Sequence, residues 1–348
     1  MPQPVLSNRR DVARRLLSAA VSVTAWAAAL GAALPALGPF NAALAQPAWP
    51  AKPVTIVVPF AAGGSIDVVA RQVATRLAAD LGQTVVVENL AGAFGTIGTQ
   101  KVARATADGY TLLFAVSSPL NVAPLVNPGA VRYDTFKDFT PVATIGMLPF
   151  AIVGRLGLGA ATMSALIQAA KAQPGKLNYG TDGTGSLLHI TGEYLKQRAG
   201  IDMVHVPYKS APQALTDVAG GQLDLAILPL ALVQPLVQEG RVRAYAVTSP
   251  ARAATLPLVP TLAEFPGFTG IALESWMGLL APAGTPRPVL DVLTASMQGL
   301  MADKARLANL EERGIKPRLL TGDAFAELLR SERRLIADVV GRMGLKPE

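Results

Sequence analysis

The sequence contains no cysteine, and this absence excludes disulfide bonds, thiol catalysis and lipid attachment through an N-terminal cysteine. Histidine is almost as scarce, with only His189 and His205 among 348 residues. Four zinc ligands therefore cannot be assembled from cysteine and histidine, and no HExxH motif occurs. Carboxylate sites for calcium or magnesium stay open, although no EF-hand spacing is present. We expect neither a metal ion nor a cofactor.

Aromatic residues make up only 5% of the chain, and no block of lysine or arginine is interleaved with them. The net charge of +7 comes from basic residues that are dispersed along the sequence. We therefore expect no binding to nucleic acid. The chain is 51% hydrophobic, and its length suffices for about two domains of ordinary size.

The N-terminal segment has the composition of an export signal. Four arginines between Arg9 and Arg15 precede an apolar, alanine-rich run from Leu16 to about Leu37, and the small-x-small sequence Ala43–Ala45 follows. This pattern predicts a secretory signal peptide over residues 1–45 and an exported protein. A single membrane anchor is the alternative, because the run approaches the length that a span needs. The Arg9–Arg10 pair also permits the twin-arginine route, so the choice between Sec and Tat export stays open.

After the signal, apolar strand-like runs alternate with amphipathic segments. The first five elements are predicted as strand, helix, strand, helix and strand: Val54–Phe60, Ser65–Gly82, Thr84–Asn89, Thr96–Ala105 and Tyr110–Val116. This order predicts a parallel sheet with helices on its faces, and hence an α/β fold.

The same alternation continues through the second half. Further strands are predicted at Ala143–Val153, Leu177–Thr181, Met203–Tyr208, Leu223–Leu228, Arg243–Ser249 and Ala272–Pro282. Helices are predicted at Met163–Ala172, Ser186–Arg198, Ala211–Ala219, Ala231–Glu239, Pro288–Arg313 and Asp323–Arg342.

Four turns of small residues follow predicted strands, and several of them open a helix: Ala61–Ser65, Ser117–Ser118, Thr181–Ser186 and Pro207–Ala211. Ligands bind at the carboxyl ends of strands in α/β sheets, and free N–H groups at helix starts suit anions. The first loop has no lysine, so it is not a P-loop for a nucleotide. Four such turns favour a binding cleft for an anion, a carboxylate as well as a phosphate, whereas each turn alone is explained by ordinary capping. Asp67 is expected to bond its own loop rather than the ligand.

A hydrolase that uses Ser186 and His189 is the enzymatic alternative. The two residues are three positions apart on one predicted helix, and the GxSxG motif is absent. Such neighbours seldom place a nucleophile, a base and a third orienting group correctly. We therefore favour packing or hydrogen-bonding roles for both histidines, and a protein that is not an enzyme.

Several blocks in the mature chain resemble, in order, the Bug/TctC family, the substrate-binding proteins of tripartite tricarboxylate transporters. The blocks are WPAKPVTIVVPFAAGGSIDVVARQVATRL, GQTVVVEN, ADGYTLL, YDTFKDFTPVATIG, GTDGTGSLLHITGEYLK, VPYKSAPQALTDVAGGQLDLAI, RVRAYAVTS, VPTLAEFPGF and WMGLLAPAGTP. The resemblance implies a two-lobed type II periplasmic binding protein, with each lobe a mostly parallel sheet flanked by helices. One lobe would comprise residues 46–148 plus 270–348, and the other residues 149–269.

The resemblance also implies an organic acid held by backbone amides, with membrane transporter subunits as partners. We expect the protein itself to be a monomer. A periplasmic sensor that serves a signalling partner stays open as an alternative. The ligand-binding residues carried over are Phe60, Ala61, Ala62, Gly63, Gly64, Ser65, Ile66, Asp67, Ser117, Ser118, Thr181, Gly183, Thr184, Gly185, Ser186, His189, Pro207 and Tyr208.

Ile66 departs from the family pattern, in which threonine is usual at this position. Leu90, Ala93, Phe94 and Thr96 make a second loop less polar than in the family. We therefore expect a ligand with one carboxylate at the glycine loop and an apolar or aromatic body beside Ile66. The alternative is that Ile66 faces the core of its lobe.

Overall fold

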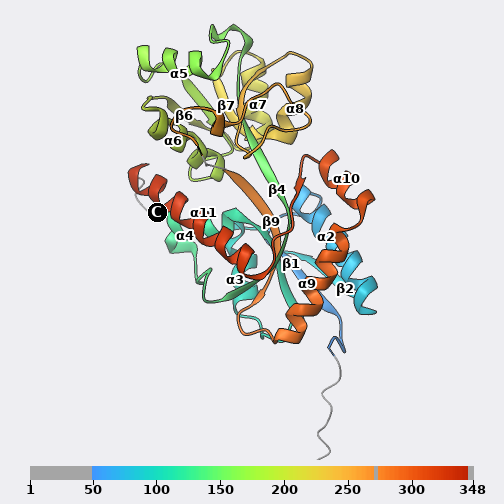
Figure 1. Cartoon of the computed structure of the whole chain (residues 1–348). Coiled ribbons are helices and arrows are strands. Elements are labelled where there is room, and N and C mark those ends of the chain that lie inside the picture. Colours follow the sequence, from blue (N-terminus) through green and yellow to red (C-terminus); the bar gives the residue numbers. More distant parts are fainter. Residues whose placement is uncertain (1–48, 270–272, 344–348) are drawn as a thin grey trace, which may run out of the picture. The chain divides into compact units, whose positions relative to one another are not determined.

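A computed structural model describes residues 49–269 and 273–343 (Figure 1). The predicted signal peptide, residues 1–45, lies outside the described residues. Within the described part of the chain, no helix combines the length and the apolar character that a membrane crossing requires.

The first predicted strand–helix alternation is confirmed. Strand β1 (Val54–Val58) pairs in parallel with β2 (Val85–Asn89) on one side and with β3 (Thr111–Val116) on the other. Helices α2 (Ser65–Leu81) and α3 (Thr96–Ala103) make the two connections. Helix α2 ends at Gly82, whose φ of 61° is left-handed and therefore suits glycine.

Two long strands add antiparallel pairings to this parallel order. Strand β4 (Phe139–Gly154) has 16 residues, and along most of its length it pairs antiparallel with β9 (Glu274–Pro282), which in turn pairs antiparallel with β3. The last residues of β4 pair with β7 (Leu225–Pro229) and β8 (Arg243–Val247). The strand order is β2-β1-β3-β9-β4-β7-β5-β6, so the α/β class is confirmed and the sheet is mixed rather than mostly parallel.

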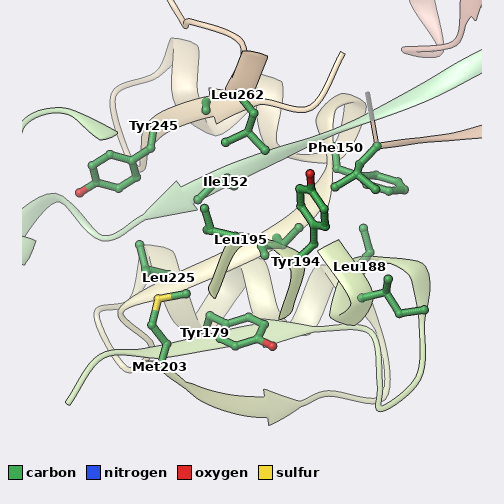
Figure 2. Close-up of a cluster of buried hydrophobic side chains, with 14 of the residues drawn as sticks. Phe150, Ile152, Tyr179, Leu188, Tyr194, Leu195, Met203, Leu225, Tyr245 and Leu262 are labelled. Carbon is green, nitrogen blue, oxygen red and sulfur yellow. The ribbon is translucent and has the colours of Figure 1, made fainter. Parts of the chain in front are cut away.

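The second group of elements surrounds β5 (Asn178–Thr181), which is parallel to both β6 (Val204–Pro207) and β7. Its helices are α5 (Met163–Ala172), α6 (Leu187–Ala199), α7 (Ala211–Ala219) and α8 (Leu230–Gln238). Figure 2 shows part of the core here, in which Leu195 of α6 belongs to one cluster with Ile152 of β4 and Tyr179 of β5.

The C-terminal region corrects one prediction. Residues 288–313 were expected to form one helix, but the structure has α9 (Arg287–Met301) and α10 (Lys304–Glu312). The break lies at Asp303, whose carboxylate accepts hydrogen bonds from the amides of Ala305 and Arg306 over 3.0 and 3.3 Å. An N-cap of this kind starts a new helix, and the spacing of apolar residues does not reveal where such a cap lies.

The last helix, α11 (Gly322–Met343), agrees with the prediction for Asp323–Arg342. Its first half contributes Phe325 and Leu329 to a core that contains Trp276 of β9. Its second half contributes Ile336 and Val339 to the core around α6. One helix thus joins two cores, and the division into lobes at residues 149–269 stays a prediction.

Shorter elements complete the described chain. A two-residue strand, β10 (Lys316–Pro317), pairs with β4. Short helical segments are Ala93–Gly95, Ser118–Val122, α4 (Ala123–Val126), Pro128–Ala130, Leu156–Leu158 and Leu262–Glu264.

Candidate functional site

A cavity of about 370 Å³ lies at the start of α2 and of α6. Most of its wall is apolar, and Asp182 is the one charged residue among the described residues that line it. The lining residues are Phe60, Ser65, Ile66, Phe94, Val116, Ser118, Val122, Ala123, Val126, Leu148, Phe150, Asp182, Gly185, Ser186, Leu187, Leu188, Pro229, Ser275 and Met277. A cavity of this size suits a small organic molecule.

The predicted glycine loop contributes Phe60, Ser65 and Ile66 to this lining. Residues 61–64 of the loop are exposed and lie outside it. Helix α2 begins at Ser65, and no side chain caps its N-terminus at Gly64. Since the first amides of a helix have no acceptor within it, this end of α2 offers hydrogen-bond donors and a positive helix dipole to an anion.

Ile66 satisfies both of the interpretations that the sequence left open. Its half-buried side chain packs against the core that contains Val69 and Val73, and it also lines the cavity. An apolar side chain therefore stands beside the amides that would hold a carboxylate.

Asp67 holds the loop from within, as the sequence predicted. One carboxylate oxygen accepts hydrogen bonds from the amide of Gly63 over 2.8 Å and from Arg71 Nε over 3.0 Å. The other accepts from Asn89 Nδ2 over 2.9 Å. Burial raises the pKa of Asp67, but these hydrogen bonds outweigh it, so the pKa is lowered and the carboxylate stays charged.

The turn after β3 separates two residues that were predicted together. Ser118 lines the cavity, whereas Ser117 is fully buried and donates a hydrogen bond to Glu332 Oε1 over 2.5 Å. Asn121 and Trp276 donate to the other oxygen of Glu332. Ser117 thus helps α11 to hold the helical segment Ser118–Val122 that forms one cavity wall.

The loop after β5 contributes Gly185 and Ser186 to the lining. Thr181 is fully buried, and its hydroxyl lies 2.7 Å from His205 Nε2. Gly183 and Thr184 lie outside the lining, as do Pro207 and Tyr208. The Tyr208 hydroxyl donates to Asp217 over 2.8 Å, and burial, together with this carboxylate, raises the pKa of Tyr208 to about 12.

His189 has a packing and hydrogen-bonding role. Its Nδ1 accepts a hydrogen bond from the amide of Gly185 over 3.0 Å, and its ring stacks on His205 with the centroids 3.8 Å apart. Ser186 caps α6 by accepting a hydrogen bond from the His189 amide over 3.1 Å. Burial lowers the pKa of His189. Nδ1, the ring nitrogen that could act as a base, therefore already accepts a hydrogen bond from the Gly185 amide. The contact between Ser186 and His189 joins the Ser186 hydroxyl to the His189 backbone and caps the helix.

Much of the apolar wall and Asp182 were not among the residues predicted from the sequence. The short helical segments after β3 contribute Val122, Ala123 and Val126, and no pattern in the sequence predicted these segments. Asp182 directly follows β5 inside a loop that had been singled out, so its position was a usable signal. Although Asp182 keeps exposed surface, the surrounding protein raises the pKa of its carboxyl by desolvation, and the Ser186 hydroxyl opposes this effect.

Comparisons with known proteins agree with the resemblance seen in the sequence. BugT from Bordetella pertussis is 35% identical over 299 residues, which cover 86% of this chain and 91% of BugT. A solved structure from R. palustris with adipate is 32% identical, covers 84% of this chain and 98% of that one, and has a TM-score of 0.71. MatC from Rhodopseudomonas palustris with bound malate is 31% identical, covers 84% of this chain and all of MatC (100%), and has a TM-score of 0.68.

The family model for TctC, the tripartite tricarboxylate transporter family receptor, matches residues 69–345. This match begins inside α2 and reaches past the end of α11, so only β1, the glycine loop and the first residues of α2 precede it in the described chain. The chain therefore belongs to the TctC family of tripartite tricarboxylate transporter receptors.

Proposed function

We propose that this protein binds an organic carboxylate in the cavity at the start of α2 and delivers it to the membrane subunits of a transporter. One observation carries the proposal: the uncapped N-terminus of a 17-residue helix begins at Ser65, in the lining of a cavity whose remaining wall is largely apolar. A carboxylate at the amides of Ser65 and Ile66 would replace the missing cap, and its hydrocarbon part would contact the apolar wall.

The energetics favour this arrangement without a salt bridge. A hydrogen bond to a charged group contributes about 1.5–3 kcal/mol, and the helix dipole adds up to about 2 kcal/mol in a partly buried site. Asp67 keeps the loop in place through Gly63, so the donors are positioned before the ligand arrives. The apolar wall contributes roughly 25 cal/mol for each Å² of hydrocarbon that it covers.

The ligands of two similar structures support the same class of compound. Adipate and malate are both carboxylates with a short carbon chain, and both are named with proteins that share about a third of this sequence. The apolar lining around Ile66 favours a longer or bulkier hydrocarbon part over a small, highly charged polyacid.

The cellular setting follows from the same proposal. Residues 1–45 would direct export and be removed, and the mature protein would act as a monomer in the periplasm. Residues 46–148 plus 270–348 and residues 149–269 would form two lobes that close around the ligand. The protein would bind and release the carboxylate unchanged, without acting as an enzyme.

Calorimetry on two variants of Ser65 tests the proposal. Ser65→Pro removes one amide donor at the first helical position, where proline is well tolerated, and Gly64 already has the extended conformation that a following proline requires. Ser65→Ala keeps that donor and removes only the hydroxyl. We expect a panel of aliphatic and aromatic carboxylates to include a ligand whose affinity falls at least about tenfold in Ser65→Pro. We expect a much smaller loss in Ser65→Ala. Equal affinities in both variants, or no carboxylate bound by the original protein, would reject the proposal.

A further inference from the structure

Asp182 is a carboxylate inside a cavity that we have assigned to a carboxylate. It follows β5 directly, and it lines the cavity together with Gly185 and Ser186 at the start of α6. No lysine, arginine or histidine is among the described lining residues, so none of them offsets this charge within the wall.

The two helix starts that line the cavity differ in their chemistry. At α2, Ser65 and Ile66 line the cavity beside free first-turn amides, and the nearby Asp67 is already bonded to Gly63, Arg71 and Asn89. At α6, the Ser186 hydroxyl already caps the helix, and the amide of Gly185 donates to His189. The first end can therefore accept an anion, whereas the second presents the carboxyl of Asp182.

A dicarboxylate that spans the cavity would bring its second negative charge toward Asp182. Two like charges brought close together repel, so the charged form of each is disfavoured and binding of the second carboxylate is weakened. Desolvation by the surrounding protein acts in the same direction, because it raises the pKa of Asp182, although this side chain keeps exposed surface. A ligand with a cationic nitrogen at this end would remove the conflict, because an ammonium pairs with a carboxylate and donates hydrogen bonds to it.

We propose that Asp182 determines specificity by selecting a ligand with a carboxylate at one end, a cationic nitrogen at the other and an apolar spacer between them. Such an ω-amino acid is preferred over the dicarboxylate of the same length. The inference rests on the proposed function, because it assumes that the first carboxylate binds at α2. In addition, one side chain after β5, that of Asp182, determines which chemical group the ligand carries at the end away from α2.

A matched ligand series tests this inference at mildly alkaline pH, where carboxyl groups are ionised. Calorimetry would compare ω-amino acids, dicarboxylates and simple monocarboxylates of four to eight carbons, for example 6-aminohexanoate, adipate and hexanoate. We expect the original protein to prefer the best ω-amino acid over its dicarboxylate counterpart by at least about tenfold. Asp182→Asn should abolish or reverse this preference, and it should change monocarboxylate affinity much less than ω-amino acid affinity.

Two further variants complete the test. Asp182→Ser should behave like Asp182→Asn, which guards against a local effect of the amide. Asp202→Asn is the control, because Asp202 is exposed, lies outside the cavity lining and is only loosely paired with Lys196 at 3.8 Å. It should keep the preference of the original protein.

The outcomes separate this inference from the proposed function. If monocarboxylates bind but Asp182→Asn leaves the preference unchanged, or if the original protein prefers dicarboxylates, the role of Asp182 is overturned and the carboxylate site stands. If no member of the series binds to any variant, both are overturned for ligands of this size.

Discussion

The carboxylate of Asp67 accepts a hydrogen bond from the amide of Gly63 over 2.8 Å, and this bond ties the first turn of α2 to the glycine loop before it. Gly63 has a φ of 83°, a left-handed conformation that glycine adopts without strain. Asn89 at the end of β2 donates to the same carboxylate. A buried carboxylate therefore fixes the shape of the loop that precedes the uncapped end of α2. Because this carboxylate is bonded to donors in its own loop, it does not face the bound anion and repel it.

We predict that Asp67→Ala lowers both stability and carboxylate affinity. The free energy of unfolding should fall by about 1–3 kcal/mol, because a buried acceptor with several donors is lost. Binding should weaken because the loop is no longer held. Urea unfolding and calorimetry measure the two effects. Asp323→Ala is the control, since Asp323 is also in the first turn of a helix but is exposed. Equal losses in both variants would contradict the role of Asp67.

Ile66 should contribute to the affinity for ligands with a hydrocarbon body. Ile66→Thr removes apolar surface from the cavity wall, so such ligands should bind about three- to tenfold more weakly, while formate-sized acids change little. Ile97→Thr is the matched control, because Ile97 is 48% exposed and lies outside the cavity lining. A titration series of carboxylates of increasing chain length makes the comparison. If Ile66→Thr binds long and short acids like the original protein, Ile66 serves only the core.

Glu274 should make stability depend on pH in the unusual direction for an acid. Its side chain is 6% exposed at the start of β9, and one of its carboxyl oxygens has no partner among the described residues. Burial raises its pKa to about 7, although the positive charges of Lys316 and Arg318 lower it. The folded state therefore holds its proton at a pH where the unfolded chain has lost it. Stability from this group is present below about pH 4.5 and is lost as the pH rises toward 7, by up to about 3 kcal/mol.

Urea unfolding of Glu274→Gln at pH 5 and pH 8 measures this effect. The variant should gain stability relative to the original protein as the pH rises between these values. Glu264→Gln is the control, because the hydrogen bond from Arg252 lowers the pKa of Glu264 to about 2 and keeps it ionised across this range. A stability difference for Glu274→Gln that stays constant with pH would show that Glu274 is ionised in the folded protein.

The two stacked histidines should remain neutral at pH values below the usual pKa of a histidine side chain. Burial lowers the pKa of His205 to about 3, and the neighbouring His189 and Lys196 act in the same direction. The unfolded chain takes up protons near pH 6.5, so stability from this group is present above that pH and is lost as the pH falls toward 3. Since the chain has only two histidines, NMR of their ring protons follows each one. A His205 signal that titrates near pH 6.5 would contradict the buried stack.

Sequence alone predicted the elements whose patterns are local. The glycine loop, the spacing of apolar residues and Gly82 predict helix α2, and its observed bounds differ from the predicted bounds by one residue. The break at Asp303 was missed because both flanking segments continue the helical pattern, and a cap is visible only from its hydrogen bonds. The mixed sheet was also missed, because an apolar strand does not reveal the direction of its neighbours.

The site was predicted less completely than the fold, for a similar reason. Three of the four predicted strand-end loops contribute residues to the cavity lining, whereas Pro207–Ala211 contributes none. Adjacent residues in a loop can also face opposite ways: Ser118 lines the cavity while Ser117 bonds to Glu332, 215 residues further along the chain. Asp182 was passed over in favour of its small neighbours. Its importance depends on the lack of any positive charge around the described wall, which is a property of the assembled cavity.

A crystal structure of the protein with its best-binding carboxylate would locate the ligand relative to α2. We expect a carboxylate oxygen within hydrogen-bonding distance of the amides of Ser65 and Ile66, with the hydrocarbon part of the ligand against the side chain of Ile66. A ligand whose carboxylate lies away from the start of α2, or outside this cavity, would contradict this expectation.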